Sequence, residues 1–116
     1  MKSLDSILNS IKKLLGLDQT YTVFDTDLII HINSVFMILT QLGVGPEQGY
    51  KITGALNVWS EFTNNDLLME SVKSYVYLKV RLMFDPPQNS THMQAIQSQI
   101  SELEWRLNVA NDVEVI

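Results

Sequence analysis

Several residue classes are missing or scarce in this chain of 116 residues, and each absence excludes a class of function. There is no cysteine, which rules out disulfides, thiolate metal sites and cysteine nucleophiles. Lys and Arg number 8 against 13 Asp and Glu, and the net charge of −5 argues against a protein that grips nucleic acid through phosphates. Neither a signal peptide nor the roughly 18 consecutive apolar residues of a membrane span is present. We therefore expect a soluble, intracellular product.

Reactive groups that could converge on a substrate are also scarce. His31 and His92 are the only histidines, and neither has the spacing of a metal site or a catalytic motif. The glycine-rich GVGPEQG at residues 43–49 has the wrong spacing to cradle phosphates. Asp25 and Asp27 are close in sequence, but the start of a helix explains both. We expect no enzyme, no cofactor and no metal site, which leaves protein–protein interaction as the residual function.

Length and composition predict one domain with one core. Hydrophobic residues make up 46% of the chain, which is normal for a globular protein. We assign residues 1–110 to a single helical domain with an excursion at residues 43–63. Residues 111–116 are assigned to an extended C-terminal tail, because the helical period is lost after residue 108.

The stretch from Asp66 to Pro87 predicts a central helix. Asn64, Asn65 and Asp66 offer N-caps, and Pro86 with Pro87 ends the helix because proline lacks a backbone donor. Its apolar residues recur at spacings of three and four, and others lie off that face, which is typical of a helix covered on more than one side. The main face consists of Leu68, Val72, Tyr75, Val76, Val80 and Met83.

Two helices are predicted before the central one. An amphipathic helix that ends at Gly16 either docks on the core or on a neighbouring subunit, which we favour, or lies on a membrane surface. A second helix spans about residues 27–42, has Asp25 or Thr26 as its N-cap, and pairs with the central helix. Three apolar residues widen the buried face of this second helix: Ile30, Met37 and Ile38.

The last helix follows the double proline, with Thr91 and Gln94 as a capping box or Ser90 as the cap. Its apolar residues form a narrow stripe spaced 3-4-3-4-3. Trp105 lies off this stripe and is either a rim anchor at a subunit interface or a residue folded over the end of the bundle. The stripe consists of Met93, Ile96, Ile100, Leu103, Leu107 and Ala110.

The excursion interrupts the helical pattern between the second and central helices. YKIT and LNVW flank Gly54 and Ala55, which predicts a long loop or at most a small β-hairpin that leans on the helices. Trp59 and Phe62 are predicted to anchor the return of the excursion to the core. Long protruding loops in compact domains are often functional, so we treat the excursion as a candidate contact region.

The basic residues of the central helix form one cluster, Lys73, Lys79 and Arg81. A patch that faces phosphates is one interpretation. Ion pairing with Glu70 and Asp85 is the simpler one, and we favour it.

Two stretches, DTDLIIHINSVFMILTQLGVGPEQGY at residues 25–50 and VKSYVYLKVRLMFDPP at residues 72–87, resemble head–tail connector (adaptor or head completion) proteins of siphophages that infect Gram-positive bacteria. The order of parts agrees over nearly the whole chain, including the WSEF excursion and the ISELEWRLN helix. The resemblance implies an all-α, compact bundle of about four helices in a virion. Such subunits form a ring, twelve-fold in the usual case, beneath the portal, join capsid to tail and extend the DNA channel.

The resemblance also implies partners and contact residues. The partners are further copies of the chain, the phage portal protein and a stopper or tail-side protein, while DNA passes without sequence-specific binding and no membrane is involved. The location is the capsid–tail junction, reached by assembly in the host cytoplasm. The portal-docking tail is Val113, Val115 and Ile116; the inter-subunit candidates are Lys73, Lys79, Arg81 and Trp105; the residues that face the lumen or the tail-side partner are Tyr50, Ile52, Leu56 and Val58.

The apolar stripe of the last helix favours an alternative from another class. A small cytoplasmic regulatory module could dimerise through such a stripe, because two apolar positions per heptad are typical of a helix–helix seam. The size of the purified protein separates the two hypotheses.

Overall fold

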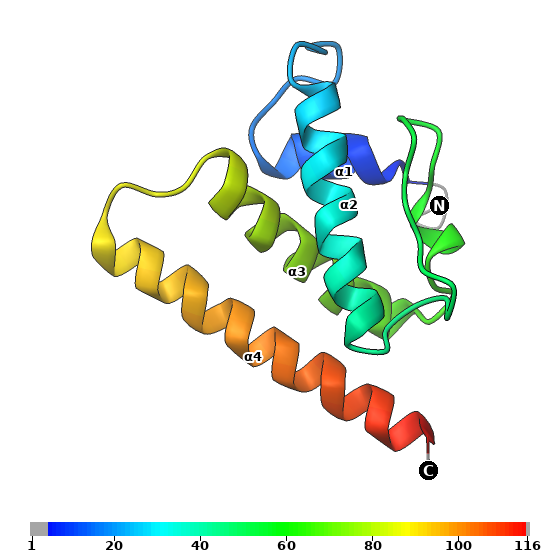
Figure 1. The fold of residues 1–116 in the computed structure, drawn as a ribbon. Helices are drawn as coiled ribbons and strands as arrows, with labels where there is room; N and C mark the ends of the chain where they lie inside the picture. Colours follow the sequence, from blue (N-terminus) through cyan, green and yellow to red (C-terminus); the bar gives the residue numbers. More distant parts are fainter. Residues whose placement is uncertain (1–4, 116) are drawn as a thin grey trace.

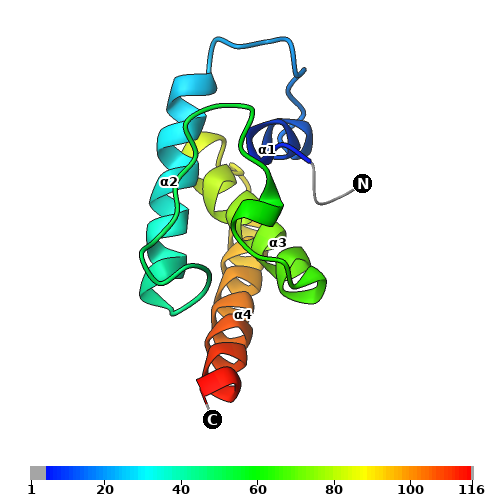
Figure 2. The same ribbon diagram turned by 90° about the vertical axis from the view of Figure 1, so that its right-hand side faces the viewer.

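The computed structural model describes the backbone of residues 5–115 and the side chains of residues 5–109. Within this part, the order of elements is α1 (Ile7–Leu14), α2 (Asp25–Gln41), a 3-10 turn η2 (Trp59–Glu61), α3 (Asp66–Phe84) and α4 (Ser90–Val115). Helix α3 packs against each of the other three helices, and α2 crosses it while α4 runs along its other side (Figures 1 and 2). The predicted all-α fold is confirmed, and so is the central place of α3.

Helix α3 begins and ends where its sequence predicts. The side chain of Asn65 accepts a hydrogen bond from the backbone N–H of Leu68 at 3.1 Å, which satisfies one of the free donors of the first turn. The helix ends at Phe84, and Asp85 leaves the helical conformation directly before Pro86. This agrees with the steric restriction that a proline imposes on the residue before it.

Helix α1 docks on the core, as favoured. Ser6 accepts a hydrogen bond from the N–H of Asn9 at 3.2 Å and caps the helix. Ile7, Leu8 and Ile11 are no more than 2% exposed, so the apolar face of α1 is buried inside the subunit. Among the described residues, no helix has the length and apolar character needed to cross a membrane.

The predicted cap of α2 is wrong. The helix begins at Asp25, Phe24 occupies the N-cap position, and no side chain caps it. Asp25 instead accepts a hydrogen bond at 2.8 Å from Nζ of Lys12, a side chain that is only 1% exposed. Nζ of Lys12 also donates to the carbonyl of Gln19 at 3.0 Å. An unpaired buried charge costs far more free energy than an uncapped helix start, so the Asp25 carboxylate pairs with Lys12 instead of capping the helix.

The excursion is a long loop, and the hairpin alternative does not form. Among the described residues it contains no strand, although a turn does occur just after Gly54. The side chain of Asn57 holds this turn, because its Oδ1 accepts from the N–H groups of Thr53 and Gly54 at 2.8 and 3.3 Å. Val58, which would pair across a hairpin, makes an isolated bridge with Ser6 instead.

Both limbs of the excursion are fastened to the helices. The amide of Asn33 on α2 accepts from the N–H of Ile52 at 2.7 Å and donates to its carbonyl at 3.0 Å. Trp59 and Phe62 are buried, as predicted, and their rings lie 6.3 and 4.9 Å from that of Phe36. The excursion is therefore a held element of the fold, and its turn protrudes beside α2 (Figure 1).

Helix α4 differs from its prediction at both ends. Asn89 accepts from the N–H of His92 at 3.1 Å, so the cap lies before Ser90 and Thr91. The helix continues to Val115, and the predicted extended tail is wrong for the backbone of residues 111–115. No glycine or proline occurs after residue 89, and a helix once nucleated gains a hydrogen bond for each residue added. The last turns project past the other helices in both views (Figures 1 and 2).

Candidate interaction surfaces

The two histidines lie on different helices, α2 and α4. His31 on α2 is half-buried and His92 on α4 is exposed, and no group of three or more His, Asp or Glu side chains in this part of the chain is placed to hold a metal ion. The surfaces that could meet other proteins are described next.

Of the four excursion residues proposed as contacts, only one is free to make them. Leu56 is 94% exposed in the turn of the excursion. Ile52 is 1% exposed and belongs to the core, while Tyr50 and Val58 are half-buried. The alternating pattern of the segment could not reveal this, because pairing of the limbs with α2 and with Ser6 decides which side chains point inward.

A hydrogen-bonded group stiffens the base of the excursion. Tyr50 Oη donates to Glu61 Oε1 at 2.7 Å, and the amide of Asn57 donates to the same oxygen at 3.0 Å. The bonds from Asn57 and Tyr50 lower the pKa of the Glu61 carboxyl. Burial, followed by the bond to Glu61, raises the pKa of Tyr50. Leu56 is thus presented on a turn whose base has little freedom.

The basic cluster of α3 is partly used inside the subunit. Nζ of Lys73 lies 5.7 Å from the ring centre of Trp59, within cation–π range. Nη1 of Arg81 donates to Tyr77 Oη at 3.3 Å. Lys79 is half-buried, like the other two basic residues. The three side chains are therefore not gathered into one phosphate-facing patch.

Helix α4 uses its apolar stripe against α3. Ile96, Ile100 and Leu107 are 3, 6 and 2% exposed. Tyr75 on α3 is fully buried, and its Oη donates to Glu104 Oε2 at 2.6 Å; burial, followed by this bond, raises the pKa of Tyr75. The stripe is consequently an internal seam of the subunit as far as Leu107, while the side chain of Ala110 lies outside the described residues.

Trp105 lies on the outside of α4 with 67% of its surface exposed. Of the two predicted roles, folding over the end of the bundle is excluded. A large exposed indole remains available for a partner, as an interface anchor requires.

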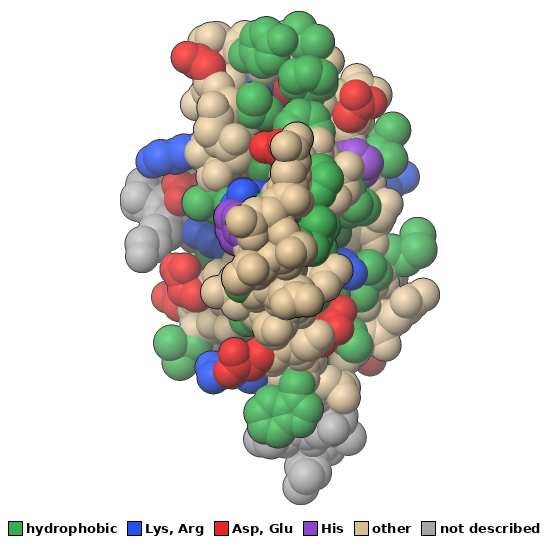
Figure 3. Space-filling view, turned by 90° about the vertical axis from the view of Figure 1, so that its left-hand side faces the viewer, with side chains coloured by type: hydrophobic (Ala, Val, Ile, Leu, Met, Phe, Trp, Pro, Cys, Tyr) green, Lys and Arg blue, Asp and Glu red, His purple; other side chains and the backbone are tan. Residues whose placement is uncertain are grey.

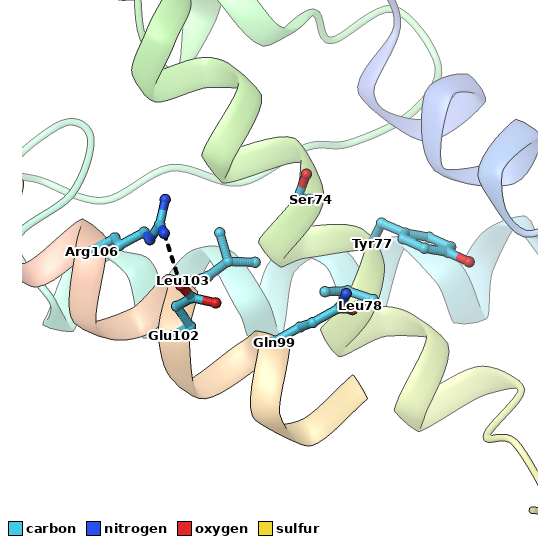
Figure 4. A pocket seen from close by; sticks show the side chains of 7 residues that line it. All are labelled: Ser74, Tyr77, Leu78, Gln99, Glu102, Leu103 and Arg106. Carbon is cyan, nitrogen blue, oxygen red and sulfur yellow. Dashed lines mark hydrogen bonds and ion pairs between the residues drawn. The ribbon is translucent and has the colours of Figure 1, made fainter. Parts of the chain in front are cut away.

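A groove lies between α3 and α4, and the sequence did not indicate it (Figure 4). Its volume is about 410 Å³. On its rim Arg106 Nη2 donates to Glu102 Oε1 at 2.8 Å, and both side chains are mostly exposed. We call this feature the α3–α4 groove; it is lined by Ser74, Tyr77, Leu78, Gln99, Glu102, Leu103 and Arg106.

Two apolar side chains on the outside of α2 are exposed, and here a prediction is wrong. Ile30 and Met37 are 58 and 64% exposed, so they do not widen the buried face. They stand one heptad apart with exposed Ser34 between them, and that spacing is the signal by which the ridge could have been found. We call the exposed stripe Asp27, Ile30, Ser34, Met37 and Gln41 the α2 ridge.

The two ends of the molecule differ. Hydrophobic side chains gather at the upper end, over the connection that leads into α2, where Tyr21 and Val23 are 46 and 69% exposed (Figure 3). The turn of the excursion lies toward the same end, whereas the last turns of α4 lie at the opposite end (Figures 1 and 2). The side chains of Val113 and Val115, and the whole of Ile116, lie outside the described residues.

Comparison with known proteins identifies one family. The sequence profile described as phage connector protein matches residues 7–114, from the first residue of α1 to the last turn of α4. No curated protein and no solved structure matches the chain.

Proposed function

Because the chain belongs to the phage connector protein family, a structural family without enzymatic activity, we propose that it forms a ring beneath the portal vertex, joins the capsid to the tail and extends the DNA channel. The family match over residues 7–114 is the observation that carries this proposal, because it spans all four helices. Membership already implies interaction with portal or tail proteins in the virion. Our proposal adds three points to family membership: the ring, its usual twelve-fold symmetry and the partner at each end of the subunit.

The side surfaces support a ring. A heterologous contact joins two different patches and, repeated by rotation, closes a ring. The α2 ridge and the α3–α4 groove are two such different patches: the first exposes Ile30 and Met37, and the second is a hollow whose lining includes the ion pair of Arg106 with Glu102. Trp105 adds a further exposed anchor on α4.

The two ends support an axial arrangement between two partners. We assign the projecting last turns of α4 to the portal, so residues 111–116 dock chiefly as the end of a helix and not as an added strand. The opposite end carries Tyr21, Val23 and the excursion turn with Leu56, which we assign to the stopper or tail-side protein.

The charge of the chain suits a channel through which DNA moves. A net charge of −5 gives few contacts to phosphates, and tight phosphate binding would oppose sliding. The Lys12 ammonium is buried and paired, which further limits the positive charge available to DNA.

Electron microscopy of the purified protein mixed with its portal tests the proposal. Rings stacked on portals are expected, and portals that remain bare at saturating protein would refute it. Deletion of residues 111–116 should abolish stacking, and full assembly of this truncated chain would refute the portal assignment. Leu56→Asp is the matched control, because it changes the opposite end and should leave portal binding intact while weakening the tail-side contact.

The alternative, a regulator that dimerises through the last helix, loses its main support. The stripe that suggested it is buried against α3, with Ile100 only 6% exposed. Sizing of the protein alone and with portal separates the two: a stable dimer that ignores portal would restore the regulator.

A further inference from the structure

We infer that α4 is a hinged arm. It opens from α3 as one unit, about the connection at residues 85–89, while α1, α2, α3 and the excursion stay packed. The arm is a property of the single subunit, so this inference goes beyond the proposed function and does not depend on the ring.

Helix α4 is attached to the subunit along one narrow face. It packs chiefly against α3, whereas α1 and α2 pack against each other as well as against α3 (Figure 1). Within residues 90–109 of α4 the buried side chains are Ile96, Ile100 and Leu107, while α3 buries six side chains. A segment with few buried apolar side chains opens at a smaller cost in free energy than the core does. We therefore expect α4 to open before α2 and α3.

The α3–α4 groove leaves part of the seam between the two helices unfilled. One wall belongs to α3 and the other to α4, and the volume between them is about 410 Å³ (Figure 4). Atoms that line an unfilled space lack contacts on one side, so this part of the seam adds little attraction. The ion pair of Arg106 with Glu102 joins two residues of α4, so it moves with the arm and does not hold α4 to α3.

A hydrogen bond closes the seam beside the apolar stripe. Tyr75 Oη on α3 donates to Glu104 Oε2 on α4 at 2.6 Å. A bond of this kind fixes the closed position of the arm, but its net contribution is modest because water can replace it when the arm opens.

The connection at residues 85–89 is bonded to the two helices that it joins. The N–H of Asp85 donates to the carbonyl of Arg81 at 2.8 Å, and the carbonyl of Asn89 accepts from the N–H of Met93 at 3.0 Å. Neither bond ties the connection to α1 or α2. A hollow of about 250 Å³ lies between Asp85 and the end of α1, so the connection is not tightly packed there.

The base of this hinge is fixed and its middle is stiff. The ring of Phe84, the last residue of α3, lies 5.1 Å from the ring of Phe24 and is held there. Pro86 and Pro87 fix their own φ, so rotation falls on the residues on either side of them. Hinges are commonly a few such residues between elements that move as rigid bodies.

The last turns of α4 move with the arm, so its opening sets the direction in which they point. We assign these turns to the portal. This consequence, unlike the arm itself, therefore rests on the proposed function.

Amide hydrogen exchange of the purified subunit tests the arm. After correction for intrinsic rates, the amides of residues 96–107 should exchange at least about tenfold faster than the most protected amides of α2 and α3. They should also share one opening free energy, as expected of a single unit. Equal protection in α2, α3 and α4 would overturn the inference.

Ile11→Val separates opening of the arm from unfolding of the whole subunit. Ile11 is buried on α1, which packs against α2 and α3. Loss of one methylene should speed exchange of the most protected amides of α2 and α3 about fivefold. The amides of residues 96–107 should not change, because the arm opens while α1 stays packed. An equal increase in α4 means that α4 opens only with the whole subunit, which contradicts the inference.

The absence of cysteine allows the arm to be clamped. Ser74→Cys and Gln99→Cys place one thiol on each wall of the groove, at two exposed positions, and a short bismaleimide joins them. The control is the same double variant capped with N-ethylmaleimide, which blocks both thiols without joining them. Linking should slow exchange of residues 96–107 at least about tenfold relative to the capped chain, and unchanged exchange would count against the arm.

Assembly on portals separates the arm from its consequence. The linked subunit should assemble about tenfold less well than the capped one, because its last turns cannot change direction. Equal assembly of the two overturns the consequence for the portal and leaves the arm standing. Failure of the unmodified chain to form rings on portals refutes the proposed function, while the exchange rates still decide the arm.

Discussion

Asp25→Ala should destabilise the subunit strongly, although Asp25 lies at the surface end of α2. Nζ of Lys12 is held at 2.8 Å from this carboxylate, and the lysine side chain is 1% exposed whereas that of Asp25 is 26% exposed. Removal of the carboxylate leaves a buried ammonium whose hydrogen bond to the carbonyl of Gln19, at 3.0 Å, and weaker attraction to exposed Asp18 replace a close ion pair poorly. Such uncompensated charges cost about 3–5 kcal/mol.

Substitution of the lysine in place of the aspartate should lower the free energy of unfolding much less. Lys12→Met keeps most of the buried aliphatic stem and leaves Asp25 partly exposed, where water replaces the lost hydrogen bond. The lost bonds then cost about 1–2 kcal/mol. Asp25→Ala should therefore lower the free energy of unfolding by about 1–4 kcal/mol more than Lys12→Met does.

Urea unfolding followed by circular dichroism measures both free energies of unfolding. With a slope of about 2 kcal/mol per molar urea, a loss of 3 kcal/mol moves the midpoint by about 1.5 M. Lys13→Met is the matched control, because Lys13 is exposed on the same turn and its loss should change the free energy by less than about 0.5 kcal/mol. Equal losses for Asp25→Ala and Lys12→Met, or a larger loss for the latter, would refute the reasoning.

Three other predictions follow from the contacts of the excursion and of α4. Asn33→Ala removes both hydrogen bonds to Ile52 and should lower the free energy of unfolding by about 2 kcal/mol, with faster amide exchange in the excursion; unchanged exchange would contradict it. Tyr75→Phe removes the bond to Glu104 and should cost about 1–2 kcal/mol in urea unfolding, whereas a neutral result would mean that the bond adds nothing to the packing of α4. Because the pKa of Glu61 is lowered in the folded state, its carboxylate stabilises the folded excursion fully above the ordinary pKa of 4.5, and this stabilisation is lost as the pH falls through the lowered pKa. Amide exchange in the excursion should become faster over that pH range, and Glu61→Gln should abolish the pH dependence.

Much of the fold could be predicted from local signals. The cap at Asn65 and the stop at Pro86 depend on the chemistry of a few neighbouring residues, and both are confirmed. The periodic burial of α3 and of the α4 stripe follows from helix geometry in the same way, except at Met83, which was predicted on the buried face of α3 and is 42% exposed near the end of the helix. Anchoring of the excursion through Trp59 was also predictable, because a large aromatic side chain in an irregular segment gains most by burial.

The candidate surfaces were predicted less well, because they depend on how distant segments pack. Ile30 and Met37 are apolar, and periodicity alone cannot say where the edge of a buried face lies when the apolar arc is broad. The four excursion residues proposed as contacts share a pattern, yet only Leu56 is fully outside. The groove needs two helices side by side, so no single stretch of sequence contains it.

By itself, the sequence determined where helices form, what caps and ends α3, the absence of cysteine chemistry and, through whole phrases of residues, the connector family. Only the tertiary structure decided that Asp25 pairs with Lys12, that Val58 bridges to Ser6 and that the α2 ridge and the α3–α4 groove lie on opposite sides. The physical reason is the separation along the sequence of the residues that interact. Caps, stops and helical periods act over a few residues, whereas the partner of a buried charge or of an extended backbone is whichever group the packing of distant segments brings within hydrogen-bond distance.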